Sequence, residues 1–332
     1  MSRVIQAKTK ELDFNSFIKN GYKVEKIALI LKKADYDEIA IATELNQNDF
    51  DMLEIAKGLR AAHFSEIAIA KAICKVGYNE LGVAQGLAVA GFSAPETAFA
   101  LKAIGYNKTS IAKGLKKADF KEIGVARGLK AMGFDTKEIA GVLKTLDYNE
   151  LSLAKALKHI GCDAFAVAEM LKEYGYNTTD ICRGLRESDF NIFEIAIGLR
   201  FLGYNVFGIT KGLKTAGYEA MSCARGLRVV GYNASEALKG LLDAGFIEKL
   251  SIKSLLGVGY EVALLVEALS DVNEVIYETL ALAKILREAE CSCFEMTKGL
   301  LAGNHDERSV IRALQAVGFS DGAIEKCIKN NH

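Results

Sequence analysis

A unit of fourteen residues recurs through almost the whole of this 332-residue chain. Each unit opens with an aromatic residue, first at Tyr22 and then at every fourteenth position to Tyr260, with Cys162 as the one exception. A three-residue slip then moves the phase, and the period resumes at Tyr277, Cys291, His305 and Phe319. The chain therefore has 22 units, 18 before the slip and four after it. Such strict self-similarity is typical of a stack of like units, each packed only against near neighbours.

Apolar residues recur at positions 6, 10 and 13 of the unit, when its aromatic residue is position 1. Position 10 is leucine in 20 of the 22 units. The spacing i, i+4, i+7 is one face of an α-helix, and the alternation of period two that strands need is absent. Position 9 is glycine in ten units, and position 7 is alanine in most. Because glycine inside a helix costs about 1 kcal/mol relative to alanine, its repetition indicates close approach of neighbouring backbones.

Both ends of this helix are marked in the sequence. Position 2 is commonly Asn, Asp or Ser, and position 5 is often acidic, which is the spacing of a capping box in Ser93/Glu96, Asp135/Glu138 and Asn233/Glu236. Position 14 is Gly in 11 of the first 18 units and Asp in five, namely Asp35, Asp49, Asp119, Asp147 and Asp189. Gly, and Asp better than most residues, accepts the left-handed conformation that ends a helix. We therefore expect the next aromatic residue to fold back on the helix that has just ended.

The sequence thus predicts an all-α fold, an α-solenoid or superhelix of about 22 short helices, each from one 14-residue repeat. We expect an N-terminal cap over residues 1–21, regular repeats over 22–259, an irregular unit over 260–276 that forms a bend or a boundary, and C-terminal repeats with a cap over 277–332. The architecture resembles that of α-solenoid families such as the tetratricopeptide and HEAT arrays. Their units are more than twice as long and their signature residues are absent here, so the resemblance implies no functional residue.

Charge, hydropathy and cysteine content narrow the class of protein. The 42 basic and 42 acidic residues balance, which excludes a strongly charged tail. No apolar run approaches the ~20 residues of a membrane span, and the first residues lack the apolar core of a signal peptide. We therefore expect a cytoplasmic protein with no membrane partner. The seven cysteines are scattered and odd in number, so we interpret them as small apolar fillers, not as a disulfide framework.

The strongest functional pattern is one of positive charge. Position 8 is Lys or Arg in 14 units, and position 11 is basic in 14 units as well. The two positions are neighbours on one helix face, so stacked units are expected to align them into a basic stripe that matches the phosphates of a nucleic acid. The candidate binding residues are Lys57, Arg60, Lys113, Lys116, Arg127, Lys130, Lys155, Lys158, Arg183, Arg186, Lys211, Lys214, Arg225 and Arg228.

A second interpretation of the same charges is structural. Basic residues in the last turn of a helix and acids in the first complement the helix dipole and keep an exposed face soluble. The recurring aromatic residues are likewise expected to be core contacts, and Phe99, Tyr174 and Phe201, which lie outside the aromatic slot, are better contact candidates. Several units also carry an apolar residue at position 4, opposite position 6, as expected of a helix sandwiched between neighbours: Leu53, Ile67, Phe165, Phe193 and Phe207.

Signals of catalysis are weak. Cys291 and Cys293 with His305 one unit later have only the C-x-C spacing of a metal site, and no phosphate-binding or nucleophile motif occurs. We therefore expect no catalytic residue, no metal and no cofactor. The favoured function is a non-catalytic interaction scaffold, a superhelical repeat protein that binds a protein or peptide partner. The alternatives are a superhelix that binds nucleic acid through the basic stripe, and a structural or assembly protein of viral type.

Overall fold

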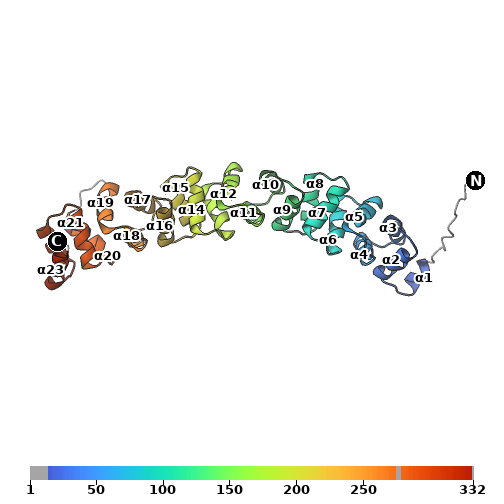
Figure 1. Cartoon of the computed structure of the whole chain (residues 1–332), viewed down its shortest axis with the longest axis horizontal. Coiled ribbons are helices and arrows are strands. Elements are labelled where there is room, and N and C mark those ends of the chain that lie inside the picture. Colours follow the sequence, from blue (N-terminus) through green and yellow to red (C-terminus); the bar gives the residue numbers. More distant parts are fainter. Residues whose placement is uncertain (1–13, 274–277, 331–332) are drawn as a thin grey trace, which may run out of the picture. The chain divides into compact units, whose positions relative to one another are not determined.

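The computed structural model describes residues 14–273 and 278–330 and folds them into α-helices joined by short turns, with no strand among these residues (Figure 1). None of the helices in this described part is both long enough and apolar enough to cross a membrane. The helices are α1 (Phe14–Lys19), α2 (Val24–Lys33), α3 (Glu38–Gln47), α4 (Met52–Ala61), α5 (Glu66–Lys75), α6 (Glu80–Val89), α7 (Ala94–Ala103), α8 (Lys108–Lys117), α9 (Glu122–Ala131), α10 (Thr136–Thr145), α11 (Glu150–His159), α12 (Ala164–Glu173), α13 (Thr178–Glu187), α14 (Ile192–Phe201), α15 (Val206–Thr215), α16 (Ala220–Val229), α17 (Ala234–Asp243), α18 (Glu248–Gly257), α19 (Val262–Asn273), α20 (Thr279–Glu288), α21 (Cys293–Ala302), α22 (Glu307–Ala316) and α23 (Asp321–Lys329).

Each of the 22 repeat units forms one helix, from α2 to α23, and α1 precedes the first unit. In regular units the helix covers positions 3 to 12, which confirms the predicted all-α solenoid of one helix per repeat. The slipped unit contains α19, which has 12 residues and is followed by residues 274–277, outside the described part. The bend or boundary over 260–276 therefore stays a prediction, and so does the opening of the next unit at Tyr277. Residues 1–13 and 331–332 of the two predicted caps also lie outside the described residues.

Short polar side chains begin most of the helices. The Ser93 hydroxyl accepts a hydrogen bond from the backbone N–H of Glu96, and the Glu96 carboxylate accepts one from the N–H of Ser93 at 2.7 Å. The Ser93 hydroxyl also donates to this carboxylate at 2.7 Å, and the bonds donated by the hydroxyl and by the backbone N–H of Ser93 hold the pKa of Glu96 below its usual range. The three predicted capping boxes are confirmed, and three more are present at Asp51/Glu54, Asn191/Glu194 and Ser292/Glu295.

The helices end in the predicted left-handed turn. After α8, Asp119 has φ 63° and its N–H donates to the carbonyl of Lys116 at 3.1 Å, while the Phe120 N–H donates to the carbonyl of Leu115 at 3.1 Å. This pair of bonds is the Schellman motif, which satisfies two carbonyls at the helix end. The five predicted Asp residues at position 14 all have positive φ. None of the described aromatic residues at position 1 is exposed, in agreement with a structural role.

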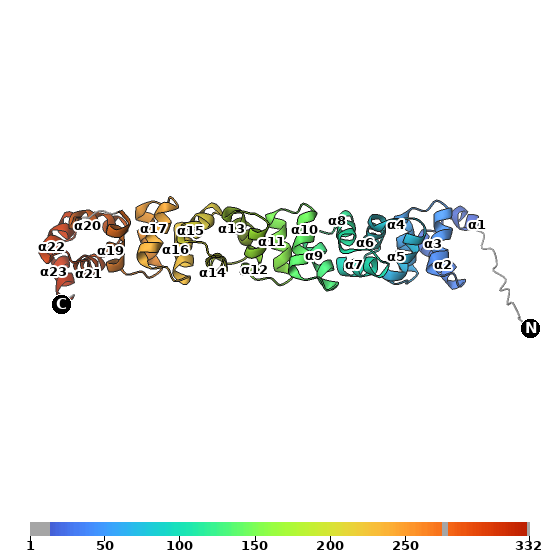
Figure 2. The same cartoon turned by 90° about the horizontal axis from the view of Figure 1, so that it is seen from above.

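The chain forms two compact units, Met1–Tyr148 and Asn149–His332, and the helices α1–α10 and α11–α23 belong to the first and the second. Within each unit, a helix packs against its sequence neighbours and also against the helices two places before and after it. Alternate helices therefore form two stacks, and in the view of Figure 2 α4, α6 and α8 lie above α5, α7 and α9. In the second unit we name them the odd stack (α11 to α23) and the even stack (α12 to α22).

The core lies between the two stacks of each unit. In α4, Ile55 and Leu59 at positions 6 and 10 are fully buried, and their counterparts along the chain are buried as well. Glycine at position 9 sets the distance between helices of one stack. A Cβ atom added to Gly128 of α9 would lie 3.1 Å from the carbonyl oxygen of Ala94 and 3.2 Å from Cβ of Ala98, both in α7. The predicted close approach of backbones at position 9 is therefore confirmed.

Candidate functional site

The cations at position 11 of the predicted basic stripe make contacts within the chain. Lys158, near the end of α11, extends to the end of α13, where its Nζ donates to the carbonyl of Ser188 at 2.6 Å. The same ammonium lies 4.5 Å from the ring centroid of Phe190, the aromatic residue that follows α13. One cation thus caps the C-terminal carbonyls of a neighbouring helix and covers the aromatic residue of its Schellman turn.

This arrangement recurs between many of the helices and the helix two places further along the same stack. Cations at position 11 hydrogen bond to the carbonyl at position 13 in Lys32–Ala62, Lys102–Met132, Lys116–Leu146, Lys158–Ser188, Lys172–Leu202, Arg186–Ala216 and Lys214–Ala244. They cover the next aromatic ring in Lys32–Phe64, Arg60–Phe92, Lys116–Tyr148, Lys158–Phe190, Lys172–Tyr204, Arg186–Tyr218, Arg200–Tyr232, Lys214–Phe246, Arg228–Tyr260 and Arg287–Phe319.

The energetics explain why a cation recurs in this slot. The C-terminal end of a helix carries a partial negative charge, and the face of an aromatic ring attracts a cation. Together with a hydrogen bond to a charged donor, these interactions stabilise the stack by about 1–2 kcal/mol per position. Burial raises the pKa of Tyr218, and the nearby Arg186 cation opposes the increase. Six of the seven candidate residues at position 11 therefore make this kind of contact, namely Arg60, Lys116, Lys158, Arg186, Lys214 and Arg228.

Position 8 of the predicted stripe is distributed over both stacks of each unit. In the first unit, Lys57 and Lys113 belong to α4 and α8, whereas Arg127 belongs to α9 of the other stack. In the second unit, each stack carries position-8 cations on four successive helices, and those of the even stack are Arg225, Lys253, Lys284 and Arg312 on α16, α18, α20 and α22. The odd-stack row consists of Lys155, Arg183, Lys211 and Lys239. Binding at these residues stays a prediction, and the position-8 side chains do not form one continuous row.

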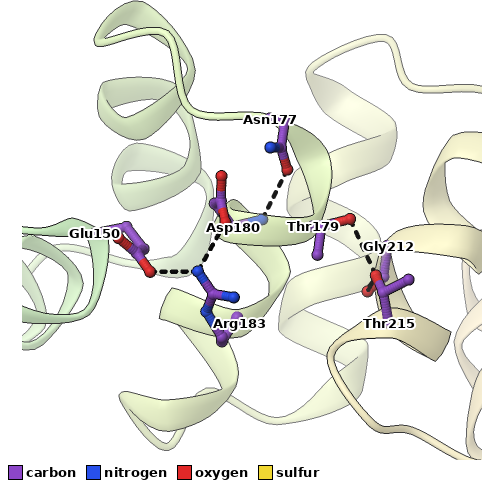
Figure 3. A network of polar contacts seen from close by, with 7 residues as sticks. All are labelled: Glu150, Asn177, Thr179, Asp180, Arg183, Gly212 and Thr215. Carbon is purple, nitrogen blue, oxygen red and sulfur yellow. Dashed lines mark hydrogen bonds and ion pairs between the residues drawn. The ribbon is translucent and has the colours of Figure 1, made fainter.

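Arg183 is the most strongly compensated cation of this row. Its guanidinium contacts the carboxylates of Glu150 at 2.5 Å and of Asp180 at 2.7 Å (Figure 3). These carboxylates raise the pKa of Arg183, with Glu150 as the main cause. On the neighbouring side, the Thr215 hydroxyl lies 3.1 Å from that of Thr179, which joins α15 to α13. The network therefore uses the charge of Arg183 to connect helices of the odd stack.

A different surface carries exposed apolar side chains. On α14, Phe193, Ile197 and Phe201 at positions 4, 8 and 12 are 40%, 37% and 76% exposed. Phe165, at position 4 of α12, packs edge-on against Phe201 with 6.2 Å between ring centroids. We name these four residues the α14 apolar face. The expectation that position 4 is covered by a neighbouring helix is wrong for Phe165, Phe193 and Phe207, which are all exposed.

The helix register explains how this face becomes continuous. Positions 4, 8 and 12 follow the spacing i, i+4, i+8 on the side of the helix opposite position 6. Position 4 of one helix meets position 12 of the helix two places later, as Thr179 meets Thr215 and Phe165 meets Phe201. Apolar residues at these positions of α12 and α14 therefore merge across the stack. The sequence signal was present in α14, where Ile197 and Phe201 replace the usual polar residues.

The three contact candidates that lie outside the aromatic slot differ in their surroundings. Phe99, at position 8 of α7, is 53% exposed but has no exposed large apolar neighbour on α5 or α9. Phe201 is the most exposed large apolar residue of the described part, whereas Tyr174 is half-buried at the end of α12. Of the three, Phe201 alone belongs to a larger apolar surface.

The candidate metal ligands are not assembled into a site. Among the described residues, no three His, Cys, Asp or Glu side chains lie close enough together to share a metal ion. The His305 ring instead contacts the Thr279 hydroxyl at 3.0 Å, and Cys291 and Cys293 are buried. Burial raises the pKa of Cys182 and of Cys223 to about 12, so neither thiol is a reactive nucleophile near neutral pH.

Comparison with known proteins adds no family to this description. No protein-family model matches the chain, and no curated protein shows significant sequence similarity to it.

Proposed function

We propose that this protein is a non-catalytic interaction scaffold that binds a protein partner through the α14 apolar face. The observation that carries the proposal is the exposure of three large apolar side chains, Phe193, Ile197 and Phe201, along one side of a single helix. Soluble proteins rarely leave such a contiguous patch uncovered unless it meets a partner. Aromatic residues in this setting are the usual source of binding energy at interfaces.

The shape of the face favours an amphipathic helix as the bound element. Its apolar residues follow helical spacing on α14 and continue to Phe165 on α12, so they form an elongated stripe and not a deep pocket. A helix with apolar residues at i, i+3, i+4 and i+7 fits a stripe of this kind. Glu169 and Glu173 lie on the α12 side, and Arg225 lies on the α16 side. These charges would orient a partner helix that carries opposite charges at its two edges.

The proposal predicts a selective loss of binding when the face is made acidic. We expect Ile197→Asp/Phe201→Asp to reduce capture of partner proteins at least ten-fold, because two charges would be buried without partners at the centre of the interface. The measurement is quantitative mass spectrometry of proteins bound to the immobilised full chain from a native lysate. Phe99→Asp is the matched control, because it places the same charge on an exposed but isolated phenylalanine of α7.

The proposal is tested by comparing the Ile197→Asp/Phe201→Asp double variant with Phe99→Asp. A discrete partner that binds the wild type and Phe99→Asp, but not the double variant, supports it. If the double variant retains every protein that the wild type captures, the α14 apolar face is not the binding surface. Both variants change exposed positions, so circular dichroism should show the helical content of the wild type.

Nucleic acid is the second candidate partner, favoured by the row of position-8 cations on the odd stack. Arg183 is compensated by Glu150 and Asp180, which leaves Lys155, Lys211 and Lys239 for phosphate contacts. Because each phosphate contact contributes about 0.9 to the salt slope, we expect log K for duplex DNA to fall against log [salt] with a slope no steeper than about −3. Fluorescence anisotropy at several salt concentrations measures this slope.

A charge-removal variant tests the nucleic-acid candidate. Replacing Lys155, Lys211 and Lys239 by Gln should remove binding, whereas Lys57→Gln/Lys113→Gln/Arg127→Gln in the first unit should leave it unchanged. Absence of binding to both DNA and RNA at low salt would eliminate this candidate. An equal loss in both triple variants would instead indicate a non-specific charge effect.

A further inference from the structure

One contact recurs between position 9 of a helix and position 3 of the helix two places earlier in the same stack. A Cβ atom added to Gly299 of α21 would clash with Cγ1 of Val262, which begins α19. An added Cβ atom would likewise meet position 3 at Gly58 (3.0 Å from Cγ2 of Val24), Gly114 (3.1 Å from the carbonyl oxygen of Glu80), Gly128 (3.1 Å from the carbonyl oxygen of Ala94), Gly212 (2.9 Å from Cγ2 of Thr178) and Gly240 (2.5 Å from Cγ2 of Val206). The architecture thus places the Cβ position of residue 9 against the residue at position 3 of the earlier helix.

Two cysteines occupy this pair of positions at the C-terminal end of the odd stack. Cys293 is position 3 of α21, and Cys327 is position 9 of α23, which packs against α21. The two side chains are close enough to influence each other, and both residues have free thiols in this structure. Cys293 is buried and Cys327 is half-exposed, so one of the two sulfurs is open to a reagent in solution.

We propose that Cys293 and Cys327 are a redox-sensitive pair that forms a disulfide between α21 and α23 when it meets a small-molecule disulfide such as oxidised glutathione. The pair is independent of the α14 apolar face, which belongs to the even stack. In a reducing thiol pool the cysteines stay as free thiols, so the link forms only under oxidising conditions.

The chemistry is two successive thiol–disulfide exchanges. The thiolate of Cys327 attacks one sulfur of glutathione disulfide, the S–S bond breaks, and one glutathione leaves and takes up a proton. The Cys293 thiol then loses its proton and attacks the Cys327 sulfur of the mixed disulfide, which releases the second glutathione. The two protein thiols are oxidised by two electrons, and glutathione disulfide is reduced to two thiols.

Burial decides the order of these steps. It raises the pKa of the Cys293 thiol to about 11, so this thiol is a poor first nucleophile near neutral pH. Cys327 is the more accessible of the two and reacts first. The contact between positions 3 and 9 then holds Cys293 beside the mixed disulfide, and this proximity compensates for its small thiolate fraction.

The disulfide would act on α23, the last helix of the described residues. α23 packs against α21 and α22 and has no later helix above it in the described residues. Terminal elements of a stack open more readily than internal ones because they have fewer neighbours. A covalent link to α21 would therefore slow the opening of α23.

The test is peptide mapping of the full chain after equilibration with a glutathione redox buffer. Trypsin cleaves after Arg287, Lys298, Lys326 and Lys329, so the expected product is peptide 288–298 linked to peptide 327–329, with the loss of two hydrogens. Hydrogen exchange of the α23 amides should slow at least ten-fold in the oxidised chain. The linked peptide should persist in Cys291→Ser, which removes the neighbouring cysteine of the same peptide.

Alanine variants complete the test, because alanine occupies positions 3 and 9 in other units, for example at Ala94 and Ala100. Cys293→Ala and Cys327→Ala should each abolish the linked peptide, and Cys293→Ala should stop at a glutathione adduct on Cys327. A wild-type chain that stops at that adduct, or that links Cys291 to Cys327, would overturn the proposal.

Discussion

Replacing Gly128 by leucine should destabilise the first unit by about 3 kcal/mol, because overpacked side chains at a helix contact force neighbouring elements apart. Even a Cβ atom at this position would lie 2.9 Å from Cδ1 of Leu115 and 3.1 Å from the Ala94 carbonyl oxygen. The leucine side chain extends further in the same direction. Separation of α7 from α9 would also disturb the stack on both sides of the contact.

Urea unfolding, together with hydrogen exchange of the α7 and α9 amides, measures this effect. Local exchange is needed because repeat arrays do not always unfold in one step. Gly322→Ala in α23 is the control, since no atom lies within 4 Å of the added Cβ. This substitution should stabilise the chain by up to about 1 kcal/mol through helix propensity. Equal destabilisation by both substitutions would contradict the role assigned to position 9.

Replacing Lys158 by methionine should destabilise the second unit by about 1–2 kcal/mol. The substitution keeps an unbranched side chain of similar length but removes the bond to the Ser188 carbonyl and the charge over the Phe190 ring. The Ser188 carbonyl and the Phe190 ring, both at the end of α13, would thus lose the cation that they share. Urea unfolding and exchange of the amides at the end of α13 provide the measurement.

The controls for Lys158 lie on the same helix and in the same slot. Lys155→Met, one turn earlier at position 8, should change stability by less than about 0.5 kcal/mol, because its charge has no comparable partner. Lys158→Arg should retain most of the stability, since Arg186 fills the equivalent slot over Tyr218. If Lys155→Met and Lys158→Met have equal effects, positions 8 and 11 do not differ as the structure indicates.

The predictions that depend on neighbouring residues were confirmed. A capping box such as Ser93/Glu96 and a left-handed turn such as Asp119 are determined within one unit, so the sequence of that unit suffices to identify them. The number and type of helices follow from the same local information. Close backbone approach at Gly128 was predictable as well, because the cost of glycine inside a helix is offset where a larger side chain would clash with a neighbouring helix.

The candidate site was harder to predict because its contacts join residues about thirty positions apart. Lys158 and Lys155 look equivalent in sequence, and only the packing of α11 against α13 shows that Lys158 reaches Ser188 and Phe190. Likewise, Phe165 and Phe201 form one surface because alternate helices share a stack. The apolar residues of α14 were visible in the sequence, but before the stacks were known the same residues were equally consistent with burial against a further helix.

The pairing of alternate helices also governs how this protein can change in length. The contacts described between helices of one stack recur at the same numbered positions, such as 3 with 9 and 4 with 12. Within either compact unit, an insertion or deletion of one repeat transfers every later helix of that compact unit to the opposite stack. Only insertions or deletions of an even number of repeats, such as two repeats or 28 residues, keep surface features on their original side. Length variants that retain a working surface should therefore differ by even numbers of repeats, a parity rule that the fourteen-residue period alone does not reveal.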